Sequence, residues 1–533
     1  MKFVSDPRIT VKIRKMKERV RWQEQSIVDR GIDQTRMVLE TQTTDSPEFS
    51  FLVAGDSGTG NHRGHNPQRQ IAEQMVSERE TCRFVLHTGD VVYLVGSSEY
   101  YLQNFIRPYR EFIVGGEHPS RIAYDGMVFN FPFLPVPGNH DYYDLPIVYG
   151  ILSATALPLR RLLGSKLDLD VGWHGSDRGN AYAKAFLDYL QAHKMPGELD
   201  RHLDAHYTAS TSTGRCLRYQ PGRFTRLPNR YYTFRSGGID FFALDSNTFN
   251  EPLPIPKTKQ GDIRRQNLEL DRQKLEQEKL AMIEMCDRLN PLIIEEAEQL
   301  DDLGAKLEQV DEILMDIEKQ LSSHKTAATD VEQLEWLKKR LIASWADSEV
   351  RGRVIYLHHP PYVTEATKWN QAQTLAVRWR LREVLDGVAD AVGDVARGRP
   401  LVDLVLTGHA HCLEYLRTGN TGHGDSGINW LVCGGSGHSL RRQRPEGPVL
   451  QEVSTPEAYR WARQSGSETA SRRVAESLLF VGRSGQGSHK RRPYSCLRID
   501  VLDGCPPKFR IRPLIVERFE GKWQDISIEP FVI

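Results

Sequence analysis

Short apolar runs that stop at a polar residue recur along the chain, at 51–54, 84–86, 133–136, 354–357 and 404–406. Runs of this length and composition predict buried parallel strands. A polar motif follows each run in turn: Asp56-Ser57-Gly58, Gly89-Asp90-Val91-Val92-Tyr93, Gly138-Asn139-His140-Asp141, His358-His359-Pro360 and Gly408-His409-Ala410-His411. In open α/β sheets, sites form at the carboxyl ends of the strands. We therefore expect an α/β fold whose polar motifs meet at one site.

Residues 257–325 have a helical period instead. Apolar residues alternate in steps of three and four at Leu300, Leu303, Leu307, Val310, Leu314, Ile317 and Leu321, and recur every seven at Leu268, Leu275, Met282 and Leu289. Asn290-Pro291 separates the two patterns, and proline can end one helix and begin the next. We predict an antiparallel coiled-coil hairpin with arms of about 28 residues, roughly 40 Å long. Such a hairpin would protrude without helping to build the site, and would serve association with a second copy or a protein partner, or be an inert insertion.

The remaining pattern divides the chain into an N-terminal helical arm, 1–48, and a core, 49–533. The basic stretch 12–21 predicts a helix that either docks on an anionic surface or packs, solvated, on the core. The core carries two further insertions, a lid-like one at 142–227 with a helix near 181–193, and a basic loop region at 440–492. The loop region would gather phosphorylated substrate or be solvated surface, and the apolar stretch 147–159 would touch lipid or be a buried helix. Strands near 495–501, 508–516 and 524–531 close the chain.

The five motifs offer two carboxylates, an amide oxygen, a phenol and several imidazoles, which are enough ligands for two metal ions. Hard Asp oxygens combined with imidazoles suit Fe, Mn or Zn better than Ca or Mg alone.

The order of these motifs resembles that of the calcineurin-like metallophosphoesterases, and within them the purple acid phosphatases. Gly58 stands where the common first motif has His, and Tyr93 follows Asp90 by three residues, as the metal-binding tyrosine of the purple enzymes does. Flanking segments agree, at 229–232, 241–247 and 412–416. The resemblance implies a four-layer α/β/β/α sandwich, into which the coiled-coil hairpin is inserted.

The resemblance also implies a ligand set for two metal ions per chain, Fe paired with Fe, Mn or Zn. One ion would take Asp56, Asp90, Tyr93 and His411, and the other Asp90, Asn139, His358 and His409, with Asp90 bridging. Tyr93 could instead be a buried core tyrosine, and His359 is expected outside the ligand set. Four further histidines near the motifs could contact phosphate or be ordinary surface or core residues: His62, His65, His87 and His438.

The implied function is hydrolysis of a phosphomonoester by attack of a metal-bound hydroxide. His140 would protonate the leaving oxygen, and Asp141 would orient His140 or a neighbour. A phosphodiesterase acting on a cyclic nucleotide, a nucleotide conjugate or a lipid head group is the nearest alternative. Nucleic acid is a less favoured substrate, because Gly58 and Tyr93 depart from the histidine-bearing motifs of nucleases. A scaffold protein with a degenerate hydrolase core is an alternative of another class.

Composition adds little to this picture. Lys+Arg and Asp+Glu both number 70, so net charge argues neither for nor against a polyanionic partner. The seven cysteines have no paired spacing, which favours reduced thiols. The N-terminus lacks an apolar signal segment, and the longest apolar stretch, 145–159, is shorter than the ~20 residues of a membrane span. We expect a cytoplasmic protein.

Overall fold

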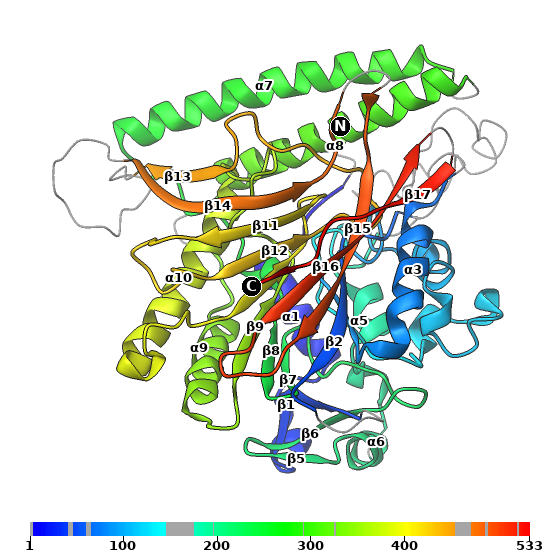
Figure 1. Cartoon of the computed structure of the whole chain (residues 1–533), viewed down its shortest axis with the longest axis vertical. Helices are drawn as coiled ribbons and strands as arrows, with labels where there is room; N and C mark the ends of the chain where they lie inside the picture. Colours follow the sequence, from blue (N-terminus) through cyan, green and yellow to red (C-terminus); the bar gives the residue numbers. More distant parts are fainter. Residues whose placement is uncertain are drawn as a thin grey trace.

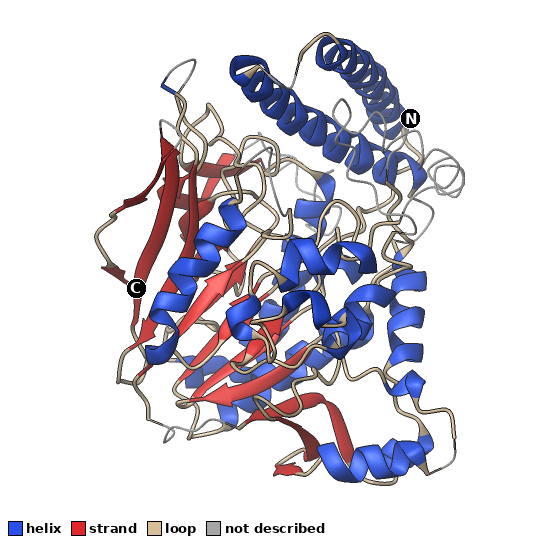
Figure 2. Cartoon of the chain, turned by 90° about the vertical axis from the view of Figure 1, so that its right-hand side faces the viewer, coloured by secondary structure: helices blue, strands red, loops and turns tan. Residues whose placement is uncertain are grey.

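The computed structural model describes residues 4–40, 46–59, 65–144, 175–195, 197–290, 293–323, 327–453, 471–485, 489–519 and 522–533. Within these residues the chain forms two mixed β-sheets that face each other, with helices on their outer sides (Figures 1 and 2). This mixed α/β arrangement is consistent with the predicted sandwich.

The larger sheet has eleven strands among the described residues. Their spatial order is β13 (Val449–Val453), β14 (Ser471–Val481), β11 (Leu413–Thr418), β12 (Asn429–Cys433), β10 (Leu404–Thr407), β9 (Gly352–Tyr356), β8 (Ile239–Ala243), β7 (Tyr232–Ser236), β1 (Ile32–Leu39), β6 (Gly214–Tyr219) and β5 (Ala209–Thr211). The central strands β8, β9, β10 and β12 run parallel. Because these strands run in the same direction, the carboxyl ends of β9 and β10, and the motifs that follow them, lie at one edge of the sheet.

The smaller sheet follows the order β17 (Lys522–Ile526), β16 (Phe509–Phe519), β15 (Pro493–Val501), β2 (Phe49–Ala54), β3 (Val85–His87) and β4 (Phe133–Pro135), and β18 (Phe531–Val532) pairs with β16. β2, β3 and β4 are parallel, as their apolar runs predicted. The first three polar motifs therefore leave this sheet at a common edge.

The main core lies between the sheets. Phe51 of β2 contacts Phe241 of β8 edge-on at 5.6 Å, and Phe84 meets Phe234 of β7 at 5.4 Å. Outside the smaller sheet, α3 (Pro67–Glu78) buries Ile71 and Met75, with Asn66 capping its first turn. Outside the larger sheet, α9 (Val331–Ala346) and α10 (Ala372–Val392) form a second apolar cluster. These layers therefore pack against both sheets, whose strand ends carry the polar motifs.

The N-terminal segment is more than a helical arm. It contains α1 (Ile9–Arg19) and α2 (Gln25–Val28), and then β1, which joins the larger sheet between β6 and β7. Met16 of α1 is fully buried, so the basic helix packs on the core. The boundary predicted at residue 48 therefore separates no independent unit.

The predicted loop region at 440–492 also contributes strands. β14 pairs with β11 and β13 extends the edge of the larger sheet, while residues 454–470 lie outside the described part. In the insertion at 142–227, the helix predicted near 181–193 is shorter, α5 (Asn180–Phe186) followed by the 3₁₀ turn η7 (Leu190–Ala192), and α6 (Glu198–His206) comes later. The apolar stretch 147–159 is not among the described residues.

Two helices of 29 residues each occupy the predicted hairpin, α7 (Lys259–Asp287) and α8 (Ile294–Ser322). They lie side by side across one end of the molecule, with α7 outermost (Figures 1 and 2). Among the described residues, no helix is both long enough and apolar enough to cross a membrane.

Candidate metal centre

The predicted ligands come together where the two sheets present their strand ends. Asp56 follows β2, Asp90 follows β3, Asn139 follows β4, His358 follows β9, and His409 and His411 follow β10. With Tyr93, these residues are here called the donor cluster, and their side chains are at most 3% exposed. Asp56, Asp90 and His409 have positive φ angles of 55°, 56° and 64°. Strained backbone of this kind in residues other than glycine tends to occur at functional sites.

One part of the donor cluster surrounds the Tyr93 hydroxyl. This hydroxyl lies 2.8 Å from Asp90 Oδ2, 3.1 Å from Asp56 Oδ1 and 3.3 Å from His411 Nε2. His411 Nε2 is itself 3.6 Å from Asp56 Oδ1. These four side chains are the ones predicted to share one metal ion.

The other part of the donor cluster surrounds His358. Its Nε2 lies 2.8 Å from Asn139 Oδ1 and 3.3 Å from Asp90 Oδ2. Asp90, His358 and His409 offer ligand atoms within 4.8 Å of one another, so this buried group could hold a metal ion. Asp90 therefore belongs to both parts of the donor cluster.

The histidines are oriented by backbone carbonyls. His358 Nδ1 donates to Thr88 O at 2.9 Å, and His411 Nδ1 donates to Ser439 O at 3.0 Å. Each ring thus directs Nε2 towards the cluster, as in metal sites whose histidines donate their second nitrogen to a carbonyl.

The electrostatics of the donor cluster favour a cation. Burial, reinforced by Asp90, raises the pKa of Asp56 to about 7. Burial alone would lower the pKa of His358, but Asp90 outweighs it and raises the pKa to about 9. Lone pairs and carboxylates held this close and away from water cost free energy without a positive charge between them. A proton on His358 or a bound metal ion can supply that charge, and the donor types suit Fe, Mn or Zn.

Two glycines of the motifs are required by close packing. A Cβ on Gly58 would overlap the Val91 carbonyl, and one on Gly138 would overlap the Asp90 carboxylate. No histidine fits at position 58 unless the backbone moves, which gives a physical reason for the departure from the common Asp-x-His motif.

His140 and Asp141 have different environments. His140 Nδ1 donates to Leu94 O at 2.5 Å, which leaves Nε2 as the nitrogen available to a substrate, and its ring lies 4.2 Å from that of Tyr93. Burial lowers the pKa of His140. Asp141 Oδ2 instead accepts backbone N–H groups of Gly138 at 2.8 Å and Asp90 at 3.0 Å. Asp141 therefore holds the loops that carry the ligands, and its bonds within the described chain do not include the His140 ring.

The other histidines near the motifs differ in their neighbours. His359 bonds to the Ser246 hydroxyl through Nδ1 at 2.8 Å. His87 bonds to Ser57 at 2.9 Å, and His65 lies beside Trp523. Four histidines near the motifs were considered as possible phosphate contacts. Among those that the structure describes, only the ring of His438 stacks on a residue of the donor cluster, Tyr93, at 4.0 Å. His62 lies outside the described residues.

The hairpin does not stand apart from the site as expected. Glu312 of α8 lies 2.6 Å from Lys368 Nζ, which is 3.0 Å from His409 Nε2. Glu308 of α8 lies 3.0 Å from His438 Nε2. The motif pattern did not include these residues. The one sequence signal was the four-residue spacing of acidic positions 308, 312 and 316, which gives α8 a charged face.

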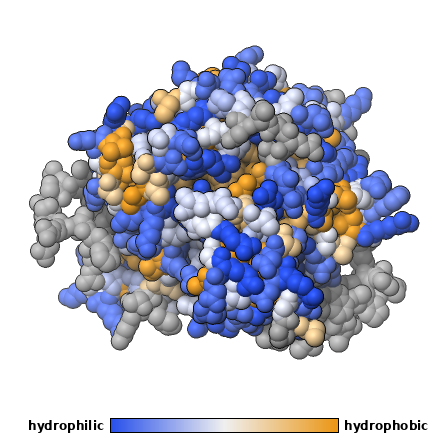
Figure 3. Space-filling model, turned by 90° about the horizontal axis from the view of Figure 1, so that it is seen from below, coloured by the Kyte–Doolittle hydropathy of each residue, from blue (hydrophilic) through white to orange (hydrophobic). Residues whose placement is uncertain are grey.

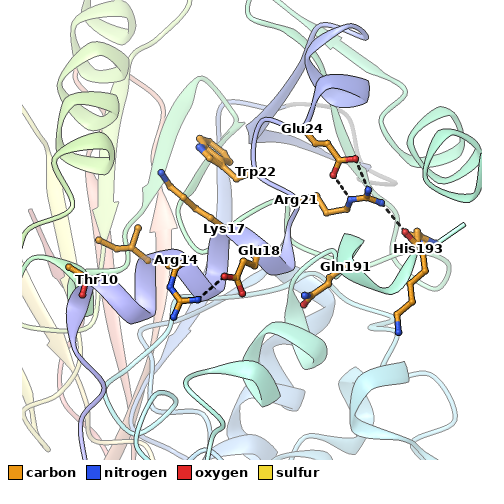
Figure 4. Close-up of a pocket in the computed structure, with 11 residues that line it drawn as sticks. Thr10, Arg14, Lys17, Glu18, Arg21, Trp22, Glu24, Gln191 and His193 are labelled. Carbon is orange, nitrogen blue, oxygen red and sulfur yellow. Dashed lines mark hydrogen bonds and ion pairs between the residues drawn. The ribbon is translucent and has the colours of Figure 1, made fainter. Parts of the chain in front are cut away.

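A surface cavity also lies away from the donor cluster. A groove of about 1000 Å³ runs along α1 and residues 191–194, and none of the donor cluster lines it. Its charges are largely matched within it, because Arg14 pairs with Glu18 and Arg21 with Glu24 and the His193 carbonyl (Figure 4). The groove therefore offers little unpaired charge to a ligand, and we do not connect it with the metal centre.

Comparison with solved structures finds similar folds at 12% sequence identity. The purple acid phosphatase PPD1 from seeds of yellow lupin (Lupinus luteus) has a TM-score of 0.39, and the match covers 92% of this chain and 55% of that one. GAP50, described as the anchor in the inner membrane complex of Plasmodium, has a TM-score of 0.35, covering 90% and 89% of the two chains. PhoD has a TM-score of 0.35, covering 92% and 70%.

The chain thus spans about half the length of the lupin phosphatase. No protein-family model matches the sequence, and neither does any curated protein. The predicted likeness to purple acid phosphatases is found again in the structure, but TM-scores below 0.5 carry no argument about function. That argument rests on the donor cluster.

Proposed function

We propose that the protein is a phosphoesterase that uses two metal ions to hydrolyse a phosphomonoester. One observation carries the proposal: side chains from five separate strand ends converge into two donor groups that share Asp90. A purely structural role does not account for so many buried lone pairs, which would be costly without a cation.

The metal ions would be held by Asp56, Asp90, Tyr93 and His411 on one side, and by Asp90, Asn139, His358 and His409 on the other. When bound, they would supply Lewis-acid stabilisation of phosphoryl oxygens and lower the pKa of water. His140, fixed through Nδ1 by the Leu94 carbonyl, would present Nε2 to the leaving oxygen and, when the ring carries a second proton there, would transfer that proton to it. Asp141 keeps Asp90 and Gly138 in register through their backbone amides.

Metal content and turnover test the proposal together. Elemental analysis of purified protein is expected to find close to two ions of Fe, Mn or Zn per chain. The loaded protein should hydrolyse an aryl phosphate faster than the matching aryl diester. Faster diester turnover would favour the phosphodiesterase alternative, with a cyclic nucleotide, nucleotide conjugate or lipid head group as substrate. Loaded protein without turnover on either ester would contradict the proposal and favour a scaffold.

Tyr93 offers a test of the metal. We expect the iron-loaded, oxidised protein to absorb visible light through charge transfer from the tyrosinate to iron. Tyr93→Phe should lose this band and keep most of its metal. Tyr143→Phe is the matched control, because Tyr143 is a buried neighbour that contacts His140. An iron-loaded wild type without the band, or a band that survives in Tyr93→Phe, would show that Tyr93 only packs.

The exposed side of α7 supports a second role for the hairpin, as a coiled coil that associates with another copy or with a protein partner. Ile263, Leu270, Leu280 and Met285 are more than half exposed on this helix. Elsewhere, exposed apolar side chains are scattered, and the face in Figure 3 is largely hydrophilic with small apolar patches. Exposed apolar side chains on a long helix can support helix association.

A further inference from the structure

Five charged or ionisable side chains link α8 to the metal centre, and they are here called the α8 cluster: Glu308, Glu312, Lys368, Arg441 and His438. Glu312 pairs with Lys368 at 2.6 Å and Glu308 with His438 at 3.0 Å. Arg441 Nη2 lies 3.5 Å from Glu308 and 3.7 Å from Glu312. Two carboxylates are thus matched by two permanent cations and one imidazole.

The cationic side of the α8 cluster directly adjoins the donor cluster. Lys368 Nζ is 3.0 Å from His409 Nε2. The His438 ring stacks on Tyr93 at 4.0 Å and meets His411 edge-on at 4.6 Å. Lysine and arginine beside a pair of metal ions repel them unless an anion lies between. Their position therefore favours an anion between these side chains and the donor cluster.

His438 gives an independent sign of a missing ligand. Its side chain is buried, only 5% exposed, and Nδ1 has no hydrogen-bond partner among the described residues. Buried polar atoms in native proteins are nearly always bonded, and one left free beside a site calls for a ligand or a water. A phosphate group, which offers both acceptor oxygens and P–OH donors, can supply the missing partner of this nitrogen.

The carboxylates of α8 fill the position of that anion. Burial would raise the pKa of Glu308, but His438 and Arg441 outweigh it and lower the pKa to about 2. Lys368 and Arg441 likewise hold the pKa of Glu312 below its ordinary value. Both carboxylates are therefore ionised at neutral pH and pair with the neighbouring cations as phosphoryl oxygens would.

The remaining contacts of α8 combine ion pairs and hydrogen bonds with the burial of Leu303, Val310 and Ile317. Asp302 pairs with Arg483, Lys490 and Arg492, and Asp316 accepts the amides of Ala372 and Gln373. Lys319 pairs with Asp6. The donor cluster is buried, so a substrate must displace something to reach it, and a helix held by ion pairs can be displaced by a competing anion.

We propose that Lys368, Arg441 and His438 form a phosphoryl subsite beside the metal ligands, which Glu308 and Glu312 of α8 fill until the phosphate of a substrate takes their place. This subsite deepens the proposed function and rests on it. It selects a phosphoryl group that keeps two charged oxygens free, and α8 must swing away before the group binds.

Inorganic phosphate binding to the metal-loaded, full-length protein tests the subsite by calorimetry. The double variant Glu308→Gln, Glu312→Gln removes the competing charges and should bind phosphate about tenfold more tightly. Lys368→Met and Arg441→Met should each weaken binding by about tenfold, the effect of losing one charge-assisted hydrogen bond. Asp311→Asn is the matched control, because Asp311 lies on α8 but pairs with Lys279 of α7.

Hydrogen exchange of α8 provides the second measurement and does not depend on the variants folding. Phosphate should speed exchange of amides in residues 303–316 of the wild type. Unchanged or weaker phosphate binding in the glutamine double variant, or slower exchange of α8 with phosphate, would overturn the subsite. Loaded protein that binds phosphate as expected but hydrolyses no ester would contradict the proposed function alone.

Discussion

Two buried groups of polar side chains lie next to each other in this protein, and they differ in charge balance. The donor cluster gathers carboxylates, a phenol and imidazole lone pairs, and the positive charge available within it is a proton on His358. In the α8 cluster, each carboxylate lies within ion-pair distance of a lysine or an arginine. The first is incomplete without a metal ion, whereas the second is complete but can exchange its anions. The contrast separates residues that we propose hold metal from residues that we propose govern access.

Breaking the donor cluster should have the largest effect. Asp90→Asn removes the carboxylate shared by both donor groups, so we expect loss of both metal ions and a fall in turnover of at least about 10³-fold. Elemental analysis and initial rates measure the two effects. Asp500→Asn is the control, since Asp500 pairs with Arg498 and Arg512 away from the site. Retention of two ions by Asp90→Asn would contradict the bridging role.

His140→Ala should separate proton transfer from metal binding. We expect turnover of an alkyl phosphate to fall by about 10²–10⁴-fold with the metal retained, since a general acid contributes that much. The loss should shrink for a nitrophenyl ester, whose leaving group needs no proton. His423→Ala, at an exposed histidine paired with Asp386, should change neither rate. Equal losses for both esters would remove the acid role.

Removing one charge from the α8 cluster should have a smaller effect than the changes in the donor cluster. Glu308→Gln should lower the free energy of unfolding by about 1 kcal/mol at neutral pH, since Glu308 is only partly buried. The pKa of Glu308 is lowered from 4.5 to about 2, so its contribution is present above pH 4.5 and is lost as the pH falls towards 2.

Thermal unfolding midpoints of wild type and Glu308→Gln, compared across pH, measure this dependence. The difference between the two midpoints should be constant from neutral pH to about 4.5 and should narrow below it. A difference that instead grows on acidification would mean that Glu308 is not ionised in the folded protein.

The smallest effect on catalysis should come from the outer arm of the hairpin. Leu270→Gln with Leu280→Gln changes exposed side chains, so stability should stay within about 0.5 kcal/mol and turnover should not change. If α7 mediates association, light scattering should show a lower mass or loss of a bound partner. Equal masses with no lost partner would show that α7 does not mediate association and only packs, solvated, on α8.

Much of the site could be predicted because each ligand follows its strand directly in the sequence. Local apolar runs indicated β2, β3, β4, β9 and β10, and the parallel pairing of β2, β3 and β4 is confirmed. The hairpin helices were predicted from their period, and the structure has both within a few residues. The ligand roles of the donor cluster stay predictions until a metal is measured.

Predictions failed where a segment is defined by distant partners. β1 lies in the segment taken as a helical arm, and β13 and β14 lie in one taken as a loop, because pairing with strands far along the chain makes them strands. Asp141 was predicted to orient His140 or a neighbour, and its Oδ2 accepts the backbone amides of Asp90 and Gly138, contacts that depend on how distant loops fold together.

The sequence by itself determined which side chains with metal-binding atoms follow the strands, since composition and spacing at strand ends are local properties. Only the tertiary structure decided what covers them. Glu308 and His438 are 130 positions apart, and Glu312 and Lys368 are 56 apart. From the sequence alone, a charged residue on a helix is predicted to be solvated. Its ion-pair partner depends on distance in space and leaves no periodic pattern in the chain.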